Sequence, residues 1–219
     1  MVDARGRAAV LRYAPHFSRD PEAVIADLES YALLLEKWQR IQNLVSRETL
    51  ADMWRRHFAD SLQVLKLLTE SDRTILDLGS GGGFPALPLA IASKGRDRRF
   101  ILVEPTSRKA SFLRTVARNL GLDVRVEARR TEDIDSRETG RVDVITSRAL
   151  ASLPQLCALA APFFGPETRA IFHKGREHVE ELVESGALWQ HDVVLVKSDT
   201  DDSGVLVELK NLRSKQVRS

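Results

Sequence analysis

The chain is poor in cysteine and has no long apolar run. Its single cysteine, Cys157, excludes an internal disulfide and a multi-cysteine zinc site. Because Cys157 lies in the apolar stretch 156–159, we interpret it as a small core residue and not as a nucleophile. A chain without disulfides suits a reducing compartment, so we expect a cytoplasmic protein. No stretch of about 18 apolar residues occurs, so we expect no membrane span.

The chain also carries little net charge, +2 over 219 residues, so its overall charge does not indicate nucleic-acid binding. Hydrophobic residues make up 43% and charged residues 29%, which is typical of a globular protein. This length suits one domain with an extension. We expect an N-terminal helical extension over residues 1–70, packed on a sheet domain over residues 71–219, as one structural unit. The sequence contains no dimerisation stripe, so we expect a monomer.

Helical patterns fill the N-terminal part. Asp20 and Pro21 supply an N-cap residue and a proline at the first helical position. A second helix is predicted to begin at a capping box formed by Thr49 and Asp52 and to continue to about Leu68. The apolar stripe of the first helix consists of Val24, Leu28, Tyr31, Leu35 and Trp38.

From Arg73 onward, short apolar strands alternate with helical stretches. The strands are predicted at 74–78, 100–103, 124–127, 142–146 and 169–173, and the helices at 85–94, 107–120, 152–163 and 176–185. Such alternation predicts an α/β fold, with a doubly wound, mostly parallel, Rossmann-like sheet covered by helices on both faces. Two further strands, 193–197 and 205–209, are expected to form a C-terminal antiparallel hairpin.

A glycine-rich loop, Asp-Leu-Gly-Ser-Gly-Gly-Gly-Phe at residues 77–84, directly follows the first strand. The dinucleotide pattern G-x-G-x-x-G would require glycine where Phe84 stands. The spacing of Gly79, Gly81 and Gly83 instead resembles the loop that binds S-adenosyl-L-methionine. Glu104 ends the second strand, where a carboxylate can bind the ribose hydroxyls of a dinucleotide or of S-adenosyl-L-methionine. We therefore predict an S-adenosyl-L-methionine site at these residues, with S-adenosyl-L-homocysteine as the product and no metal.

The residues after the fourth strand restrict the acceptor atom. Methylation of an exocyclic amino group usually needs an Asn/Asp-Pro-Pro-aromatic loop, but residues 146–149 read Thr-Ser-Arg-Ala. Methylation of cytosine C5 needs a cysteine nucleophile, which Cys157 does not provide. Guanine N7 has a free lone pair and needs no base, so the sequence permits N7 chemistry. Arg148 is expected to position the reactants by holding a phosphate, guanine O6 or the cofactor carboxylate; a salt bridge to a neighbouring acid is the alternative.

Several motifs in family order resemble the RsmG family, also called glucose-inhibited division protein B. They are residues 56–62 (Arg-His-Phe-Ala-Asp-Ser-Leu), 77–88, Lys109 with 112–114, 130–133 (Arg-Thr-Glu-Asp), 147–149 and 174–175. The resemblance implies a class I methyltransferase fold and methylation of a guanine N7, at nucleotide 527 of bacterial 16S rRNA. It implies 16S rRNA or the small ribosomal subunit as partner.

The resemblance also assigns site residues. Those expected to bind the cofactor, together with the loop glycines and Glu104, are Phe84, Thr131, Glu132 and Arg148. Those expected to face RNA are Asn43, His57, Arg130 and Lys174; for His57, bracing the loop is an equal alternative. Lys109 forms a basic helix face with Arg114 and Arg118 and is also expected to face RNA phosphates, with a simply solvated face as the alternative. Two residues depart from the family pattern, Ala86 in place of a frequent glycine and Thr131 in place of alanine or valine. Methylation of a different acceptor and non-catalytic sensing of the cofactor remain rival functions.

Overall fold

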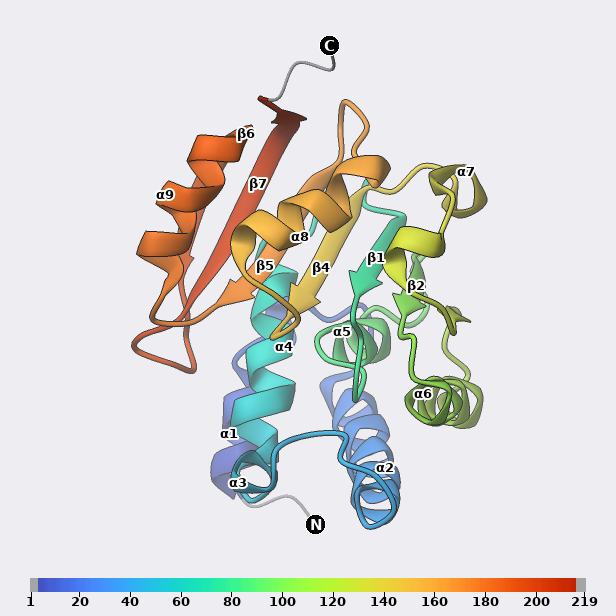
Figure 1. The fold of residues 1–219 in the computed structure, drawn as a ribbon. Helices are drawn as coiled ribbons and strands as arrows, with labels where there is room; N and C mark the ends of the chain where they lie inside the picture. The colour runs from blue at the N-terminus through green and yellow to red at the C-terminus, as the bar shows by residue number, and fades with distance from the viewer. Residues whose placement is uncertain (1–3, 216–219) are drawn as a thin grey trace.

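The computed structural model describes residues 4–215, which fold around one seven-stranded sheet (Figure 1). The strand order is β3-β2-β1-β4-β5-β7-β6. The five strands from β3 to β5 are parallel, whereas β7 pairs antiparallel with both β5 and β6. The strands are β1 Thr74–Leu78, β2 Arg99–Val103, β3 Val124–Glu127, β4 Val144–Arg148, β5 Arg169–Lys174, β6 Trp189–Lys197 and β7 Val205–Ser214. The predicted doubly wound sheet with a C-terminal hairpin is therefore confirmed.

Helices cover both faces of the sheet because the central strands are apolar on both faces. One face packs against α5 (Ala86–Ala92) and α6 (Ser107–Leu120), and α2 (Pro21–Gln39) belongs to the same core. The other face packs against α8 (Leu153–Ala160), which lies in front of the sheet in Figure 1 and contacts α9 (His178–Leu188). Cys157 lies in this second core and is fully buried, as its apolar neighbours predicted.

The N-terminal helices share a core with the sheet. The short helix α1 (Ala4–Leu11) contributes Val10, and α2 contributes Leu28 and Tyr31, to the cluster that also holds strand residues Ile75 and Leu102. The α2 helix begins as predicted, since the Asp20 side chain accepts a hydrogen bond from the Glu22 N–H and Pro21 follows. No helix within residues 4–215 is long and apolar enough to cross a membrane.

The second N-terminal helix differs from its prediction. It does not begin at a Thr49–Asp52 capping box; the chain forms a short α3 (Arg47–Leu50), a π-helical turn at Trp54–Ala59, α4 (Asp60–Leu62) and a 3₁₀ turn at Gln63–Lys66. The Thr49 hydroxyl bonds to Ser46 and His57 and caps no helix. A π-helical turn inside a helix is rare and occurs often at functional sites.

The fourth strand is also shifted relative to its prediction, from 142–146 to Val144–Arg148. Asp143 closes the amino end of the sheet instead, because its carboxylate accepts the N–H groups of Arg73 and Thr74 at 2.8 and 2.9 Å. Arg148 is consequently the last residue of β4 and not a loop residue. The remaining short helix, α7 (Ser136–Thr139), carries a complete capping box formed by Asp135 and Glu138.

Candidate functional site at the carboxyl ends of the strands

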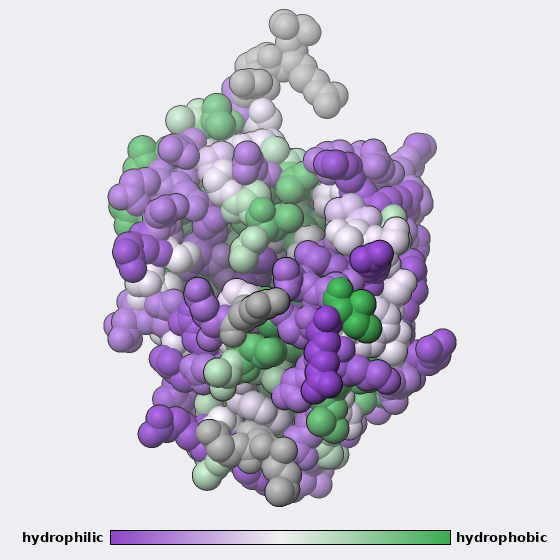
Figure 2. All heavy atoms as spheres, turned by 60° about the horizontal axis from the view of Figure 1, so that its bottom comes forward, coloured by the Kyte–Doolittle hydropathy of each residue, from purple (hydrophilic) through white to green (hydrophobic). Residues whose placement is uncertain are grey.

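A cavity of about 740 Å³ opens at the carboxyl ends of the parallel strands. Ligands in open α/β sheets bind at this edge, and the volume lies in the range of small-molecule sites. Figure 2 shows this end of the molecule, where apolar patches lie among hydrophilic side chains. Five parts of the described chain supply the lining: the glycine-rich loop, the N-terminal segment from Leu44 to Gln63, the segment after β2 from Glu104 to Lys109, the ends of β4 and β5, and the turn between β6 and β7.

The glycine-rich loop turns with positive φ angles at Gly79 (+67°), Gly81 (+54°) and Gly83 (+96°), which side chains rarely adopt. Gly79 and Gly81 line the cavity. A Cβ at Gly81 would meet only the Gly79 carbonyl oxygen, at 3.8 Å, so the loop is open there. Gly83 lies outside the cavity lining, and a Cβ there would overlap Leu87 and approach the Tyr31 hydroxyl to 2.7 Å. Gly83 thus serves the packing of the loop on helices α5 and α2.

Glu104 is fixed at the floor of this loop. It is only 4% exposed, so it is not a solvated carboxylate. One oxygen accepts the Gly81 N–H at 2.9 Å and the other accepts the Thr106 N–H at 2.8 Å. The carboxylate therefore lines the cavity in one orientation, and its remaining lone pairs can accept hydrogen bonds from a ligand's hydroxyl groups.

Aromatic rings support the loop from behind. The Phe84 ring stacks on His57, with centroids 4.8 Å apart, and on Tyr31, at 5.5 Å. The Tyr31 hydroxyl donates a hydrogen bond to the Gly82 carbonyl oxygen. Because Tyr31 is fully buried on α2, the N-terminal helix fixes the loop directly. The sequence showed Tyr31 only as a member of an apolar stripe.

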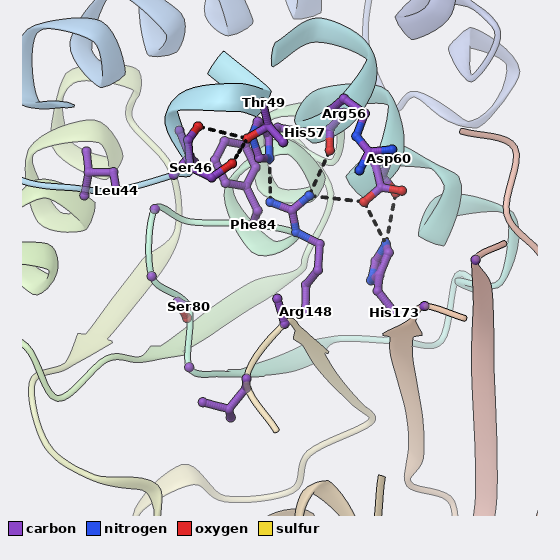
Figure 3. A pocket seen from close by; sticks show the side chains of 18 of the residues that line it. Leu44, Ser46, Thr49, Arg56, His57, Asp60, Ser80, Phe84, Arg148 and His173 are labelled. Carbon is purple, nitrogen blue, oxygen red and sulfur yellow. Dashed lines mark hydrogen bonds and ion pairs between the residues drawn. The ribbon is translucent and has the colours of Figure 1, made fainter. Parts of the chain in front are cut away.

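Arg148 projects from the end of β4 into the lining of the cavity (Figure 3). Its Nη1 donates to the Arg56 carbonyl oxygen at 3.0 Å and to Asp60 Oδ2 at 3.1 Å. Its Nη2 donates to His57 Nδ1 at 2.7 Å, and the guanidinium carbon lies 4.9 Å from the centre of the Phe84 ring. The structure thus contains the salt bridge that was the alternative interpretation of Arg148.

The same contacts fix the tautomer of His57. Since the Arg148 guanidinium can only donate, Nδ1 accepts, and Nε2 carries the proton toward the Thr49 hydroxyl at 2.8 Å. Burial and the positive charge of Arg148 lower the pKa of His57 to about 3, so the ring is neutral. His57 is 6% exposed and braces Phe84, while it also lines the cavity.

The sequence analysis gave Asp60 no role of its own, although Asp60 lies in the motif at residues 56–62. It also gave no role to Thr200, Gln63 or His173, which contact Asp60. Its Oδ1 accepts from the Thr200 hydroxyl at 2.6 Å and from Gln63 Nε2 at 2.9 Å. Its backbone oxygen contacts His173 Nε2 at 3.0 Å. Thr200 lies in the turn between β6 and β7, which no local pattern places beside residue 60. Only pairing of distant segments brings these groups together.

The two lysines expected to face RNA differ in the structure. The Lys109 side chain lines the cavity and forms no hydrogen bond or ion pair within residues 4–215. The Lys174 ammonium forms an ion pair with Glu181 at 2.6 Å and donates to the Ala151 carbonyl oxygen at 2.9 Å. With its side chain 9% exposed, Lys174 holds the loop after β4 and is not free to bind phosphate in this conformation.

The other predicted site residues lie outside the cavity lining. Asn43 is exposed beside Leu44, which does line the cavity. Thr131 is buried at the start of the 3₁₀ turn after β3, whereas the side chains flanking it are exposed. Those flanking residues are Arg130 and Glu132. Their roles remain predictions.

Comparison with known proteins identifies the family. The model of rRNA small subunit methyltransferase G matches residues 24–202. The ribosomal RNA small subunit methyltransferase G of Cereibacter sphaeroides is 42% identical over 187 residues, which cover 84% of this chain and 89% of that protein. The chain belongs to the rRNA small subunit methyltransferase G family. The resemblance inferred from the motifs is therefore confirmed.

Solved structures confirm the fold of this methyltransferase G family member. A variant of MtNAS in complex with S-adenosylmethionine is 19% identical, with 86% of this chain and 76% of that chain covered and a TM-score of 0.54. Precorrin-6y C5,15-methyltransferase from Geobacter metallireducens is 12% identical, with 78% and 93% covered and a TM-score of 0.51. At such identities the likeness shows the fold alone, which is the Rossmann-like class I methyltransferase fold.

The cavity of this methyltransferase G family member fits a nucleoside cofactor. The open backbone at Gly81 and the fixed carboxylate of Glu104 lie together on one side of the cavity. Asp77, at the end of β1, has an Oδ2 atom that is buried and without a hydrogen-bond partner among the described residues. Burial raises the pKa of Asp77 to about 6, and its Oδ1 accepts from the Thr146 hydroxyl at 2.7 Å.

Proposed function

We propose that this protein transfers a methyl group from S-adenosyl-L-methionine to N7 of a guanine in 16S ribosomal RNA, at nucleotide 527. The observation that carries the proposal is membership of a family whose members are named ribosomal RNA small subunit methyltransferases, in a chain whose glycine loop and acidic residues line one cavity. The position of the guanine rests on the resemblance of the motifs to the RsmG family.

Under this proposal, the chain's own residues bind and orient both reactants. Gly79, Gly81 and Glu104 hold the cofactor, and Phe84 closes one side of the site. When bound, S-adenosyl-L-methionine supplies an electrophilic methyl group on a sulfonium. Thr131 and Glu132 are proposed to contact the adenine from the segment after β3. Positioning supplies most of the rate enhancement in such a displacement.

The groups beside Arg148 suit an acceptor that needs no deprotonation. His57 is neutral, but both of its ring nitrogens already have hydrogen-bond partners. Cys157 is fully buried in the opposite core, where burial raises the pKa of its thiol to about 11. Neither residue is thus placed to act as a base or a nucleophile at the cavity. Guanine N7 attacks with its own lone pair, so this arrangement is sufficient for it.

Lys109 is proposed as the main phosphate contact among the residues expected to face RNA, because it lines the cavity and its ammonium has no hydrogen-bond or ion-pair partner in the described part of the chain. Asn43 and Arg130, which are exposed and outside the cavity lining, are proposed as further RNA contacts. If the acceptor is RNA, methyl transfer should weaken steeply as salt rises, since binding releases counterions. An enzyme with a small-molecule acceptor would show little salt dependence.

The proposal is tested by incubating the protein with labelled S-adenosyl-L-methionine and with 16S rRNA or small subunits that lack the modification. Reduction and aniline cleavage then map any 7-methylguanine. We expect a single cleavage at nucleotide 527, and its loss in Arg148→Met. Label at another nucleotide would replace the target but keep the reaction class. Cofactor binding without any label on either substrate would contradict the proposal and favour a different acceptor or a sensor.

A further inference from the structure

Asp60 connects four separate parts of the chain at the cavity. It begins α4, directly after the π-helical turn. Its carboxylate holds Arg148 at the end of β4 and Thr200 in the β6–β7 turn, and its backbone oxygen contacts His173 on β5. Figure 3 shows the side chains of Asp60, Arg148 and His173 converging from different elements. The Asp60 side chain is 15% exposed, so these contacts are largely shielded from solvent.

The Asp60 carboxylate is ionised at neutral pH. Burial alone would raise its pKa, but the adjacent His173, the charge of Arg148 and hydrogen bonds from Thr200 and Arg148 lower it below its ordinary value. Its two oxygens accept hydrogen bonds from different partners: Oδ1 accepts from Thr200 and Gln63, and Oδ2 accepts from Arg148. Thr200 and Gln63 therefore fix the plane of the carboxylate, and that plane in turn fixes the position of the guanidinium.

Arg148 retains unused donors in this arrangement. A guanidinium has five N–H groups. Two on Nη1 bind Arg56 and Asp60, and one on Nη2 binds His57. The Nε–H and the second N–H of Nη2 have no hydrogen-bond partner in the described part of the chain. The Phe84 ring lies against the guanidinium, so rotation of the plane is restricted.

We propose that Asp60 is a positioning residue for methyl transfer: it fixes Arg148 so that the two remaining N–H groups bind an anionic or carbonyl oxygen of a reactant in the cavity. This inference rests on the proposed function and names the residue that makes Arg148 effective. Asp60 itself touches no reactant in this scheme. Thr200, through its hydroxyl, supports Asp60 from the turn between β6 and β7.

A double-mutant cycle tests the inference. Asp60→Asn, Arg148→Met and the double variant are compared for kcat and KM, with thermal unfolding measured on each protein. Because a misplaced group about 1 Å from its productive position can cost about 100-fold, we expect kcat of Asp60→Asn to fall on the order of 10- to 100-fold. The double variant should be no slower than Arg148→Met, since Asp60 acts only through Arg148. Additive losses would overturn the inference.

Two sets of variants separate positioning from general stability. Asp52→Asn removes the acid of an exposed ion pair with Arg55 near the same helical segment, at 3.7 Å, and should leave kcat unchanged. Thr200→Val removes the hydroxyl that supports Asp60, whereas Thr200→Ser keeps it. We expect a fall in kcat for the valine variant and wild-type kcat for the serine variant. Equal losses in both would contradict the role of the hydroxyl.

A readout without substrate distinguishes failure of this inference from failure of the proposed function. In ¹H–¹⁵N spectra of the free protein, a fixed Arg148 should give separate guanidinium resonances, assigned by their absence in Arg148→Met. These should merge or shift in Asp60→Asn and stay unchanged in Asp52→Asn. Unchanged Arg148 resonances in Asp60→Asn would overturn the inference even in an active enzyme. Separate resonances that Asp60→Asn merges, in a protein that methylates no rRNA, would support positioning and contradict only the acceptor.

Discussion

Two largely buried arginines on neighbouring strands lie at opposite ends of those strands. Arg148 ends β4 at the cavity, and Arg169 begins β5 at the amino edge. Their side chains are similarly buried, at 17% and 14% exposed. Each binds a backbone carbonyl of the N-terminal helical segment, Arg56 for Arg148 and Leu67 for Arg169, both at 3.0 Å. Both arginines therefore join the N-terminal helical segment to the sheet.

The difference lies in the other partners. Arg169 binds two carboxylates, Asp72 at 2.7 Å and Glu208 at 2.6 Å, and does not line the cavity. Arg148 has one carboxylate, Asp60, while its third partner is the neutral ring of His57. Both guanidiniums use two N–H groups of Nη1 and one of Nη2, but two carboxylates balance the charge of Arg169 away from the cavity, whereas Arg148 lines the cavity with a single carboxylate partner. A buried arginine is a functional candidate when its partners leave part of the guanidinium unpaired beside a cavity.

The largest effect is expected on stability from Arg169→Met. Removing the guanidinium leaves buried Asp72 without its ion-pair partner and leaves Glu208 with only Lys210 at 3.9 Å, and breaking a buried ion pair from one side costs about 3–5 kcal/mol. Chemical denaturation should show this loss in the free energy of unfolding, with kcat of the folded fraction close to wild type. A stable variant with lost activity would reverse the comparison between the two arginines.

Arg148→Met should mainly affect catalysis. Removal of a preorganised electrostatic donor lowers kcat by about 10²- to 10³-fold. Its loss of stability should be smaller than that of Arg169→Met, because the Asp60 carboxylate keeps its hydrogen bonds from Thr200 and Gln63. Single-turnover methylation and denaturation of the same preparations decide the point. An active Arg148→Met would contradict a catalytic role for this guanidinium and remove the functional contrast between the two arginines.

The unpaired oxygen of Asp77 predicts a pH effect specific to the cavity end. Its pKa is raised to about 6 in the folded chain, above the ordinary value of 3.8, so the folded state holds the proton while the unfolded state loses it. The free energy of unfolding of wild type should therefore fall relative to Asp77→Asn as pH rises through this window, by about 3 kcal/mol. Denaturation of both proteins at several pH values measures this difference in the free energy of unfolding. A difference that does not change with pH would contradict the raised pKa of Asp77.

The smallest expected difference is between two matched glycine variants. Gly83 (φ +96°) lies in the cavity loop and Gly95 (φ +94°) follows α5 near the opposite edge. Gly95→Ala meets nothing within 4 Å and should cost only the backbone strain, about 1–2 kcal/mol. Gly83→Ala also overlaps Leu87, which should add about 1–3 kcal/mol. Equal losses in thermal unfolding would show that the loop relaxes around the added methyl group.

The local sequence pattern was sufficient to predict an element whose backbone hydrogen bonds are formed within that element. The helix expected at 107–120 is α6, Ser107–Leu120, and it ends at Gly121 with φ +59°, a conformation that glycine adopts easily. For residues 49–68, in contrast, the local pattern predicted the wrong start of the helix. Thr49 and Asp52 resembled a cap, but the Thr49 hydroxyl bonds to His57, which itself stacks on Phe84. Contacts with the glycine loop, which are distant in sequence, decided that local structure.

In the candidate site, too, the sequence predicted the residues of local motifs but not the partners that packing gives to them. Glycine spacing and the acid after the second strand predicted Gly79, Gly81 and Glu104, and all three line the cavity. Periodicity gave no role to Tyr31, which hydrogen-bonds to the loop. Lys174 was expected to face RNA, yet its ammonium is paired with Glu181 on α9. Tertiary packing determines which group pairs with a buried charge, so a local sequence pattern does not predict it.

The sequence by itself determined the alternation of strands and helices, the conformation of the glycine loop and the family, because these depend on local periodicity, on φ angles open to glycine and on motifs in order. Only the tertiary structure decided which donors of Arg148 are engaged, that His57 is neutral and that Thr200 supports Asp60. Those properties depend on burial and on contacts between segments more than 80 residues apart, since Arg148 meets Asp60 at a separation of 88 residues.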